Sequence, residues 1–553
     1  MVVASAPVWL TGCDARNRPD LILHNAKVFT ASPDRAWADA IAVSADRIVG
    51  VGSSQQMLET ASRDTRTVDV GGRVIVPGFN DAHWHPGFAF IDGEDLGFGQ
   101  PAADPPLDEV LDSIRAAAAR TPSGTWIWAP VGGTVFADAR TGRVALDAVS
   151  LNHPVMLSGW GGHGRVLNSV AETAFAAWLE QRDAGSAVAD SLSSNGIRHG
   201  YDGFRVDLML QRPLDLLTTA NFEREQTAAL GWGVTSIQVM AYPLDEHGTI
   251  AALEQVGPRL RWSFYRMPTT MNSLERPTRL DSSSSLDTGS GLKVILDGSP
   301  VERMALQREP YADMPGWRGR TYMTMPQLRA ALAVALQTGE QLAVHAVGDS
   351  AIGLLFRTMR EFEEADWPAQ RLRVEHADGL RPDLVDAARE LGVVVVQNPT
   401  HLTLPDVFER RHGAAGRQGL QPMRSLLRAG VLLALGSDGP PNPFLNIMFA
   451  AMHPASPGEA LTVEQAVAAY TRGSAWAQRS EPEKGTIEEG KLADLAVLSQ
   501  DIFEVPLDQL PATVSLLTLV GGRVEHAAAP FTDLAPMIRP ATATAAALRL
   551  RER

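Results

Sequence analysis

Eight short apolar runs that alternate with helical stretches constrain the fold of this chain more than any other feature. The runs are rich in β-branched residues, and the segments between them are rich in Ala and Leu. Strands that alternate with helices form parallel sheets, and eight such units close into a (β/α)8 (TIM) barrel. The sequence therefore predicts an α/β protein built on this barrel. The eight runs cover residues 73–83, 232–240, 259–266, 291–298, 340–349, 371–378, 392–400 and 430–439.

The spacing of the runs predicts two additions to the barrel. About 140 residues separate the first run from the second, so we expect an inserted subdomain at about 95–228 within a barrel of residues 74–482. Short strand-like segments, separated by Asp, Gly and Ser turns, occupy residues 20–73 and 483–528. These two regions predict a small composite β-sandwich formed by the N- and C-terminal segments. Residues 1–19 and 529–553 are expected to be tails.

The first run ends in two histidines, His83 and His85, within the motif VIVPGFNDAHWHP. Side chains at positions i and i+2 of a strand point to the same face, so both imidazoles would face one spot. Neutral imidazole nitrogens are good ligands for divalent transition metals. The alternative is a chance pair in a loop, and the ends of the other runs distinguish the two interpretations.

Four of the other runs also carry a residue that could bind a metal: Lys293, His345, His376 and Asp438. The C-terminal strand ends of a barrel meet at one face, where active sites lie. Taken singly, each histidine is compatible with a core histidine bonded to backbone, and Asp438 with a turn cap. Lys293 is harder to explain, because a lysine among apolar neighbours must lose its charge, pair or be modified. The only cysteine is Cys13, so metal ligands must come from His and carboxylates.

The ordered set of motifs resembles the amidohydrolase superfamily, and within it the amidohydrolase 3 branch that contains the N-substituted formamide deformylases. The resemblance runs from about Asp20 to about Val524 and rests on VIVPGFNDAHWHP, GGHGRVLNS, GVTS, KVILDGSP, HAVGDSA, RVEHAD, GSDGP and GTIEEGKLADLAVL. It implies one or two divalent metals, most simply Zn2+, with Mn2+, Fe2+ or Co2+ as alternatives. The pair His83 and His85 would bind the first metal, and the pair His345 and His376 would bind the second.

The same resemblance implies roles for three further residues. Lys293 would carry a carboxylate derived from CO2 that bridges the two metals, and Asp438 would bind the first metal beside the catalytic water. His163, in the motif SGWGGHG, matches a position at which relatives place a histidine over the substrate. The alternative for His163 is a Gly-rich turn without a catalytic role.

These implications predict a metal-dependent hydrolase that cleaves a C–N bond of an amide, an N-formyl compound or a carbamate-like small molecule. Metal binding makes hydroxide available near neutral pH, and Asp438 would take the water's proton and deliver it to the leaving nitrogen. His163 would donate to the developing oxyanion. Two alternatives stay open: an esterase, lactonase or phosphoester hydrolase using the same site, and a binding protein that has lost catalysis.

Five aromatic residues are expected near the mouth of the barrel, where they would suit an apolar acyl or amine group. The alternative is that they fill the core, as aromatic residues of barrels often do. These five residues are Trp84, Phe88, Trp160, Phe264 and Trp317.

The composition limits the partners of this protein. The net charge is −15 and no basic run is present, which argues against nucleic acid, and no apolar stretch reaches the roughly 18 residues that a membrane span requires. We expect a small-molecule substrate, and homo-oligomerisation stays open. We also expect a cytoplasmic protein. The tetrapeptide LTGC at Leu10–Cys13 resembles a lipobox, so a lipid-anchored or exported protein is the alternative if the start site is misassigned.

Overall fold

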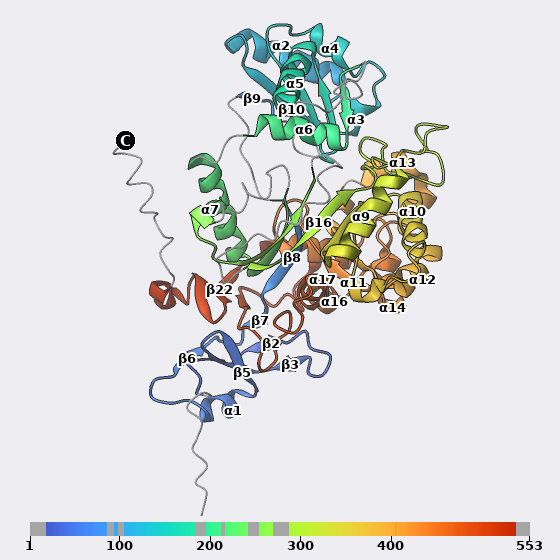
Figure 1. The fold of residues 1–553 in the computed structure, drawn as a ribbon. Coiled ribbons are helices and arrows are strands. Elements are labelled where there is room, and N and C mark those ends of the chain that lie inside the picture. The colour runs from blue at the N-terminus through green and yellow to red at the C-terminus, as the bar shows by residue number, and fades with distance from the viewer. Residues whose placement is uncertain are drawn as a thin grey trace, which may run out of the picture.

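An eight-stranded parallel sheet forms the centre of the molecule, between a five-stranded lobe and two sheets near the chain ends (Figure 1). The computed structural model describes residues 18–85, 93–97, 104–182, 195–211, 216–241, 251, 254–268, 287–403, 405–417 and 419–537. The predicted Leu10–Cys13 motif and Phe88 lie outside these described residues. The barrel strands are β8 (Phe79–Trp84), β14 (Val234–Ala241), β15 (Arg261–Arg266), β16 (Asp287–Ile295), β17 (Gln341–Ala346), β18 (Arg373–His376), β19 (Val394–Gln397) and β20 (Leu432–Leu435).

The barrel strands follow the chain in order, from β8 to β20, and each pairs in parallel with the next. The last strand returns to the first, because the Asp438 amide donates to the His83 carbonyl oxygen at 2.8 Å. The Ser437 amide also donates to the Asp81 carboxylate at 2.8 Å. The predicted (β/α)8 barrel is therefore confirmed, and each of its eight strands overlaps one of the eight predicted runs.

The first predicted run forms two strands in different sheets, which the sequence did not indicate. Residues Val74–Pro77 form β7 of a terminal sheet, and β8 of the barrel begins at Phe79. Gly78 separates them, and its Cα lies so close to the Thr235 side chain that a Cβ at this position would collide with it. A glycine here lets the chain pass tightly from one sheet to the next.

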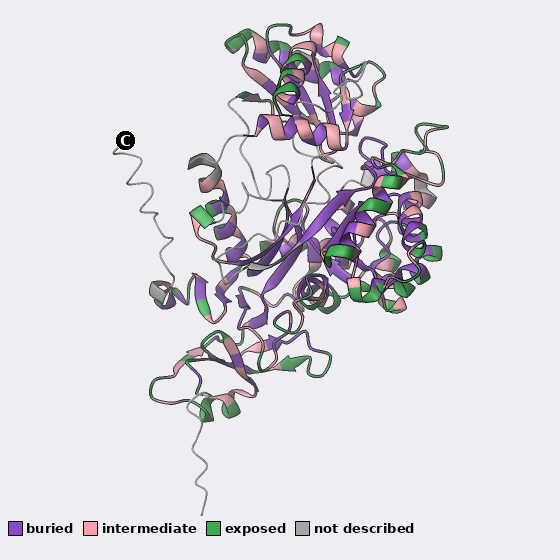
Figure 2. Ribbon diagram, in the orientation of Figure 1, coloured by how far each residue is buried: buried purple, intermediate pink, exposed green. Residues whose placement is uncertain are grey.

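Helices pack against the outside of the barrel, and Figure 2 shows the buried strands beside helices such as α9, α10 and α12, whose outer faces are exposed. The strands are buried because both faces of a parallel barrel sheet are covered. Helix α9 begins with a capping box at Thr324 and ends at Gly339 in the left-handed conformation. The helices of this region are α7 (Leu216–Gly231), α9 (Met325–Thr338), α10 (Asp349–Arg360), α11 (Trp367–Gln370), α12 (Pro382–Glu390), α13 (Pro405–Arg417), α14 (Met423–Ala429), α15 (Pro443–Met452), α16 (Val463–Ala468) and α17 (Ser474–Ala477).

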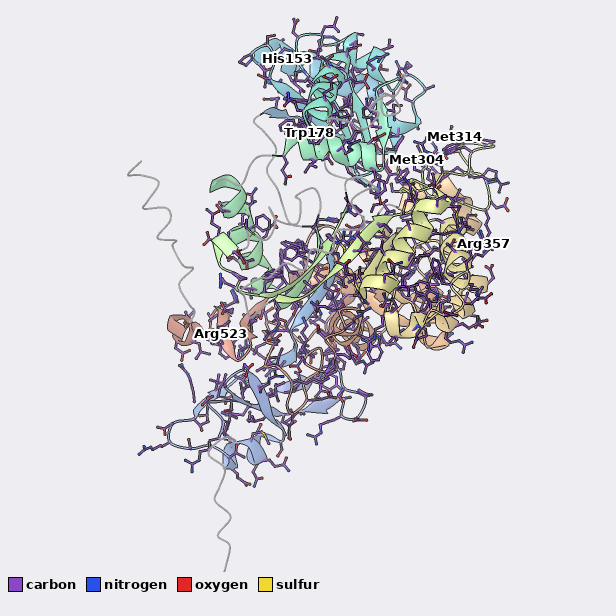
Figure 3. All side chains as sticks on the ribbon, in the orientation of Figure 1. His153, Trp178, Met304, Met314, Arg357 and Arg523 are labelled. Atoms are coloured by element: carbon purple, nitrogen blue, oxygen red, sulfur yellow. The ribbon has the colours of Figure 1, made fainter. Side chains whose placement is uncertain are left out.

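The lobe inserted between β8 and β14 has a five-stranded sheet with its own cores. Separate apolar clusters lie around Ile127 and Leu157 and around Phe175 and Met156. Figure 3 shows His153 and Trp178 in this lobe, well apart from Arg357 of α10. Its elements are β9 (Gly93–Asp95), α2 (Leu107–Arg120), β10 (Trp126–Val131), α3 (Gly133–Ala137), α4 (Arg143–Asp147), β11 (Val155–Gly159), β12 (Gly164–Leu167), α5 (Ser169–Arg182), β13 (Ile197–His199) and α6 (Tyr201–Leu210).

Strands from both ends of the chain form a second unit, as the predicted terminal sandwich requires. A six-stranded sheet has the order β23-β22-β21-β7-β2-β3, and a four-stranded sheet has the order β5-β4-β1-β6. One apolar cluster joins Leu23 and Ile41 to Leu495 and Leu517. The strands are β1 (Leu21–His24), β2 (Lys27–Phe29), β3 (Trp37–Ala38), β4 (Ala40–Ser44), β5 (Arg47–Gly52), β6 (Arg66–Asp69), β21 (Leu495–Leu498), β22 (Ser515–Val520) and β23 (Arg523–Ala527), with helix α1 (Ser54–Glu59) beside them.

No helix in the described ranges is both long enough and apolar enough to cross a membrane.

A buried ion pair attaches the barrel to the terminal sheet. Arg261 at the start of β15 donates to both carboxylate oxygens of Asp494, at 2.7 and 3.0 Å. The side chains of both residues are less than a tenth exposed. Removing one partner of such a pair leaves a buried charge without compensation.

We therefore expect Arg261→Ala to lower the free energy of unfolding by about 3 kcal/mol, measured by urea denaturation. The control is Arg63→Ala, since the Arg63–Asp64 pair is almost fully exposed and its loss should change stability by less than about 0.5 kcal/mol. Equal effects of the two substitutions would show that the buried pair does not stabilise the connection.

Candidate metal centre

All seven residues that the sequence predicted for the site line one cavity of about 420 Å³. Six of them lie near the C-terminal ends of barrel strands or in the loops that follow these strands. His163 comes from the inserted lobe, in the segment between β11 and β12. The cavity therefore has a floor made by the barrel and a roof made by the lobe. The seven residues are His83, His85, His163, Lys293, His345, His376 and Asp438.

Three of these histidines have an acceptor beside Nδ1, which assigns the proton to Nδ1 and the lone pair to Nε2. An imidazole in this form is a metal ligand whose orientation is fixed by its outer partner. Burial lowers the pKa of His83 to about 4, so this ring is neutral near pH 7. The acceptors are Glu375 Oε2 for His83 (2.6 Å), the Met240 carbonyl for His85 (3.1 Å) and Asn398 Oδ1 for His376 (2.8 Å).

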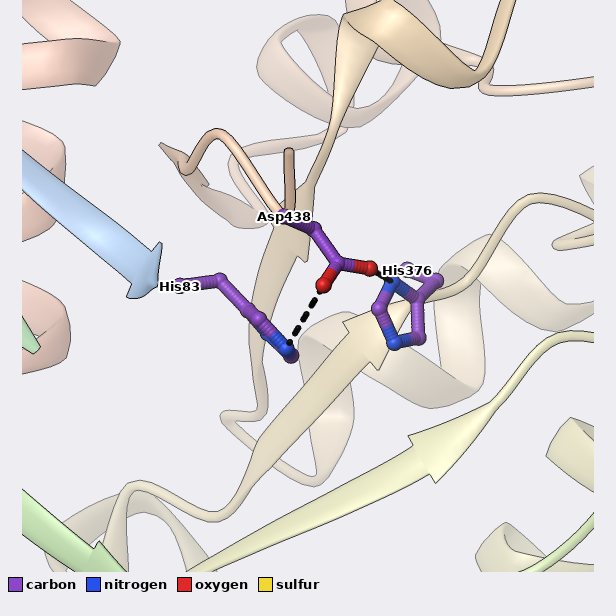
Figure 4. Close-up of side chains that lie close together, drawn as sticks. All are labelled: His83, His376 and Asp438. Atoms are coloured by element: carbon purple, nitrogen blue, oxygen red, sulfur yellow. Dashed lines mark ion pairs between the residues drawn. The ribbon is translucent and has the colours of Figure 1, made fainter. Parts of the chain in front are cut away.

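The Asp438 carboxylate lies among these rings, and Figure 4 shows it between His83 and His376. Its Oδ1 is 3.6 Å from His83 Nε2 and 3.3 Å from His85 Nε2, whereas its Oδ2 is 3.6 Å from His376 Nδ1. Burial acts to raise the pKa of Asp438, but interactions with His83 and the neighbouring imidazoles hold it well below its ordinary value. The carboxylate is therefore an anion. His83, His376 and Asp438 each offer a ligand atom, and these atoms lie within 4.8 Å of one another.

Lys293 and His345 complete the floor. Burial lowers the pKa of the Lys293 amine to about 8, although the charges of Glu375 and Asp438 act to raise it. His345 Nε2 is buried and has no hydrogen-bond partner in the described part of the chain. Its nearest carboxylate oxygen, on Asp297, is 3.9 Å away. Buried polar atoms are normally satisfied, so His345 Nε2 indicates a partner that the protein itself does not supply.

His163 lies over this floor. Its ring centroid is 4.5 Å from that of His345, and its buried Nδ1 has no hydrogen-bond partner among the described residues. Burial lowers the pKa of His163 to about 3, so the ring is neutral and carries one N–H donor. The structure thus brings His163 beside the other candidate residues, while its role stays a prediction.

The Gly-rich roof approaches the barrel closely. A Cβ at Gly161 would collide with Ser299, which lines the cavity after β16. Ser299 in turn donates from Oγ to the buried carboxylate of Glu302. Glycine at position 161 therefore lets the His163 segment pack directly on the loop that follows the Lys293 strand.

Several residues that support the site were missed in the sequence. Glu375, which accepts from His83, is fully buried, and Arg373 donates to both of its oxygens at 2.7 and 3.1 Å. Burial acts to raise the pKa of Glu375, but Arg373 and the hydrogen bond from His83 hold it far below its ordinary value. The alternation of Arg373 and Glu375 along an otherwise apolar strand was the available signal, since buried charges must pair.

His401 was also missed, although it lines the cavity. It belongs to the short 3-10 helix η5 (Pro399–Thr403), which follows the seventh barrel strand. Its Nε2 is 3.3 Å from Asp438 Oδ2, and its Nδ1 is 3.2 Å from Asp378 Oδ2. Burial alone would lower the pKa of His401, but these two carboxylates raise it to about 10. A histidine four residues beyond a barrel strand was the sequence signal.

The aromatic predictions were mostly wrong. Trp160 lines the cavity, but Trp84 and Phe264 pack in the hydrophobic core, and Trp317 donates from Nε1 to a backbone carbonyl. A sequence run does not show which side of a strand end faces the barrel interior. The apolar wall of the cavity is formed by Trp160, Phe204, Met267, Ile295, Val301, Val347 and Phe408.

The residues present fit a divalent transition metal. Neutral imidazoles with Nε2 lone pairs, an ionised carboxylate and the buried Nε2 of His345 without a partner form a nitrogen and oxygen donor set that suits zinc and its neighbours. The acceptors on the outer nitrogens are those that metal-binding histidines require.

Comparison with known proteins agrees with this geometry. The family model described as "Amidohydrolase family" matches residues 66–526. The N-substituted formamide deformylase of Arthrobacter pascens is 26% identical over 559 residues, which span 92% of this chain and 98% of that enzyme. Protein LONG AFTER FAR-RED 3 of Arabidopsis thaliana is 26% identical over 547 residues, 91% of each chain. An uncharacterized metal-dependent hydrolase from Pyrococcus horikoshii shares the fold with a TM-score of 0.65 and 20% identity, covering 88% of this chain and 99% of that one.

Proposed function

The chain belongs to the amidohydrolase family and is a hydrolase of carbon–nitrogen bonds other than peptide bonds, and from this premise we propose its substrate class and its catalytic groups. The substrate is an uncharged small amide, N-formyl compound or carbamate-like molecule with an apolar group. One observation supports the proposal most. Imidazoles that could bind a metal, the ionised Asp438 and several apolar side chains all line the same cavity.

The metal of this proposal is held by side chains from five strand ends, and zinc is the first candidate. When bound, a divalent metal supplies an activated water and polarises the scissile carbonyl. His83 and His85 present Nε2 toward the space beside Asp438 Oδ1. The proposed ligands are His83, His85, Lys293, His345, His376 and Asp438.

Asp438 is the proposed proton carrier. Its pKa lies far below neutrality, so its carboxylate can accept the proton of the attacking water at Oδ1. The same oxygen then delivers this proton to the departing nitrogen, which leaves as a neutral amine. Asp438 is about one-fifth exposed through the cavity, so it reaches the reacting atoms while the cavity wall limits bulk water.

The apolar wall supports the substrate class. A cavity of about 420 Å³ takes a molecule of roughly drug-fragment size, and such pockets bind ligands through apolar contacts and a few polar groups. On its roof, Arg165 donates to both carboxylate oxygens of Asp207, so this ion pair has no net charge. This balance favours an uncharged substrate over an anionic one.

We expect faster catalysis of aryl formamides and aryl acetamides than of matched aryl esters, expressed as kcat/KM relative to the uncatalysed rate at equal leaving-group pKa. Dialysis against a chelator should abolish this activity, and stoichiometric Zn2+ or Mn2+ should restore it. A larger rate acceleration for esters would contradict the C–N specificity. Purified protein without metal that no divalent ion activates would contradict the whole proposal.

The second expected outcome concerns Lys293. The neutral amine would add to CO2, forming an N–C bond and releasing one proton, and the resulting carbamate would be an oxygen ligand. Lys293→Ala should therefore lose bound metal and lower kcat/KM by about 100-fold or more, with partial recovery in formate or acetate. Lys27→Ala is the control, since Lys27 pairs with Asp501 and Glu504 at the surface. Full activity and metal content in the Lys293 variant would exclude this role.

The third expected outcome concerns His163, which we propose as the donor to the developing oxyanion. His163→Asn should lower kcat by about 100-fold, because it removes one positioned donor, while metal content stays at the wild-type level. His24→Asn on β1 is the matched control. Loss of metal from the His163 variant would identify this residue as a ligand instead.

A further inference from the structure

A row of hydrogen bonds connects Asp438 to residues outside the predicted ligand set. His401 lies between two carboxylates, with Nε2 3.3 Å from Asp438 Oδ2 and Nδ1 3.2 Å from Asp378 Oδ2. The His401 ring also stacks on His376, with ring centroids 5.3 Å apart and an interplanar angle of 27°. The ring is thus fixed at both nitrogens and on one face.

Asp378, at the end of this row away from Asp438, is held firmly in place. Gln421 donates from Nε2 to Asp378 Oδ1 at 2.8 Å and from its backbone amide to the Asp378 carbonyl, also at 2.8 Å. Gln421 is completely buried and Asp378 is 3% exposed. Both oxygens of Asp378 therefore have assigned partners, and Asp378 can hold His401 in one orientation.

The Asp438 carboxylate, at the other end of the row, needs a hydrogen bond to hold its orientation. Asp438 has a backbone φ of 43°, in the left-handed region that is unusual for a residue other than glycine. The terminal torsion of an aspartate is broad, so its two oxygens exchange positions easily unless hydrogen bonds hold them. Here Oδ1 is beside His83 and His85, whereas Oδ2 is the oxygen beside His401.

We propose that His401 is a positioning residue that holds Oδ2 of Asp438 and thereby presents Oδ1 to the reacting atoms, with Asp378 as its anchor. This inference rests on the proposed function of Asp438 as the proton carrier. It adds to that function by giving the two oxygens of Asp438 different roles. Oδ2 is held by His401, and Oδ1 takes part in the reaction.

Substituting His401 by glutamine or by asparagine tests the hydrogen bonds of its two ring nitrogens one at a time. The amide of glutamine reaches the position of Nε2, so His401→Gln keeps a donor for Asp438 and loses the bond to Asp378. The shorter amide of asparagine reaches the position of Nδ1, so His401→Asn keeps the contact with Asp378 and loses the donor for Asp438. Both variants remove the same ring and its stacking on His376, which makes each a control for the other.

We expect His401→Asn to lower kcat by about 30-fold with KM changed less than about twofold, because a supporting hydrogen bond costs 10 to 100-fold. His401→Gln should stay within about fivefold of wild type. Zinc content, measured by elemental analysis, should equal that of wild type in both variants. Equal losses in the two variants, the reverse order, or loss of zinc comparable to that in His83→Ala would overturn the proposal.

A structural readout keeps the inference separate from the proposed function. In crystal structures of the zinc-loaded His401→Asn and His401→Gln proteins, we expect the Asp438 carboxylate to turn about its Cβ–Cγ bond only in the asparagine variant. An unchanged carboxylate in the asparagine variant would overturn the positioning role, whether or not a substrate has been found. Absence of hydrolysis by wild-type protein, together with the expected rotation, would instead contradict the proposed function alone.

Discussion

The hydrogen bonds that join Arg373, Glu375 and His83 inside the barrel are the interaction on which the rest of the site depends. Arg373 and Glu375 on β18 are fully buried, so each charge needs the other. Arg373 also donates to the Ala82 carbonyl of β8 at 2.6 Å, and Glu375 accepts from the His83 ring at 2.6 Å. The first and sixth barrel strands are thereby tied across the interior. Because the same carboxylate fixes the His83 tautomer, the charge pair inside the barrel also orients the imidazole that we propose as a metal ligand.

Closure of the barrel explains how residues far apart in the sequence meet. The Asp438 amide donates to the His83 carbonyl, which places the end of the last strand beside the end of the first. Gly436 faces His83 so closely that a Cβ at this position would collide with the His83 backbone. The inserted lobe then covers this end of the barrel and brings His163 over the floor. The barrel thus positions His83, Lys293 and Asp438 and forms most of the cavity lining, while the lobe covers the cavity from the other side.

The sequence predicted the repeating parts of this structure and missed those that depend on side-chain direction. The eight strands and the ends carrying Lys293, His345, His376 and Asp438 followed from apolar runs, because strand ends meet at one face of any such barrel. His401 escaped notice, since it lies beyond its strand in a 3-10 helix and reaches Asp438 only through the fold. Trp84 was misassigned, although it neighbours two site histidines, because alternate residues of a strand point to opposite faces. The alternation of Arg373 and Glu375 indicated a buried charge pair, but it did not indicate that Glu375 accepts from His83, which lies 292 residues earlier in the chain.

The central claim is that these strand ends form a metal centre, and anomalous X-ray diffraction from zinc-loaded crystals tests it most directly. The account predicts an anomalous peak about 2.0–2.1 Å from Nε2 of His83 and of His85, with Asp438 in contact and any second peak near His345 and His376. Extra density on Lys293 would show the carbamate. Zinc found only at surface sites, with the His83 and His85 rings bound to no ion at saturating metal, would contradict the account.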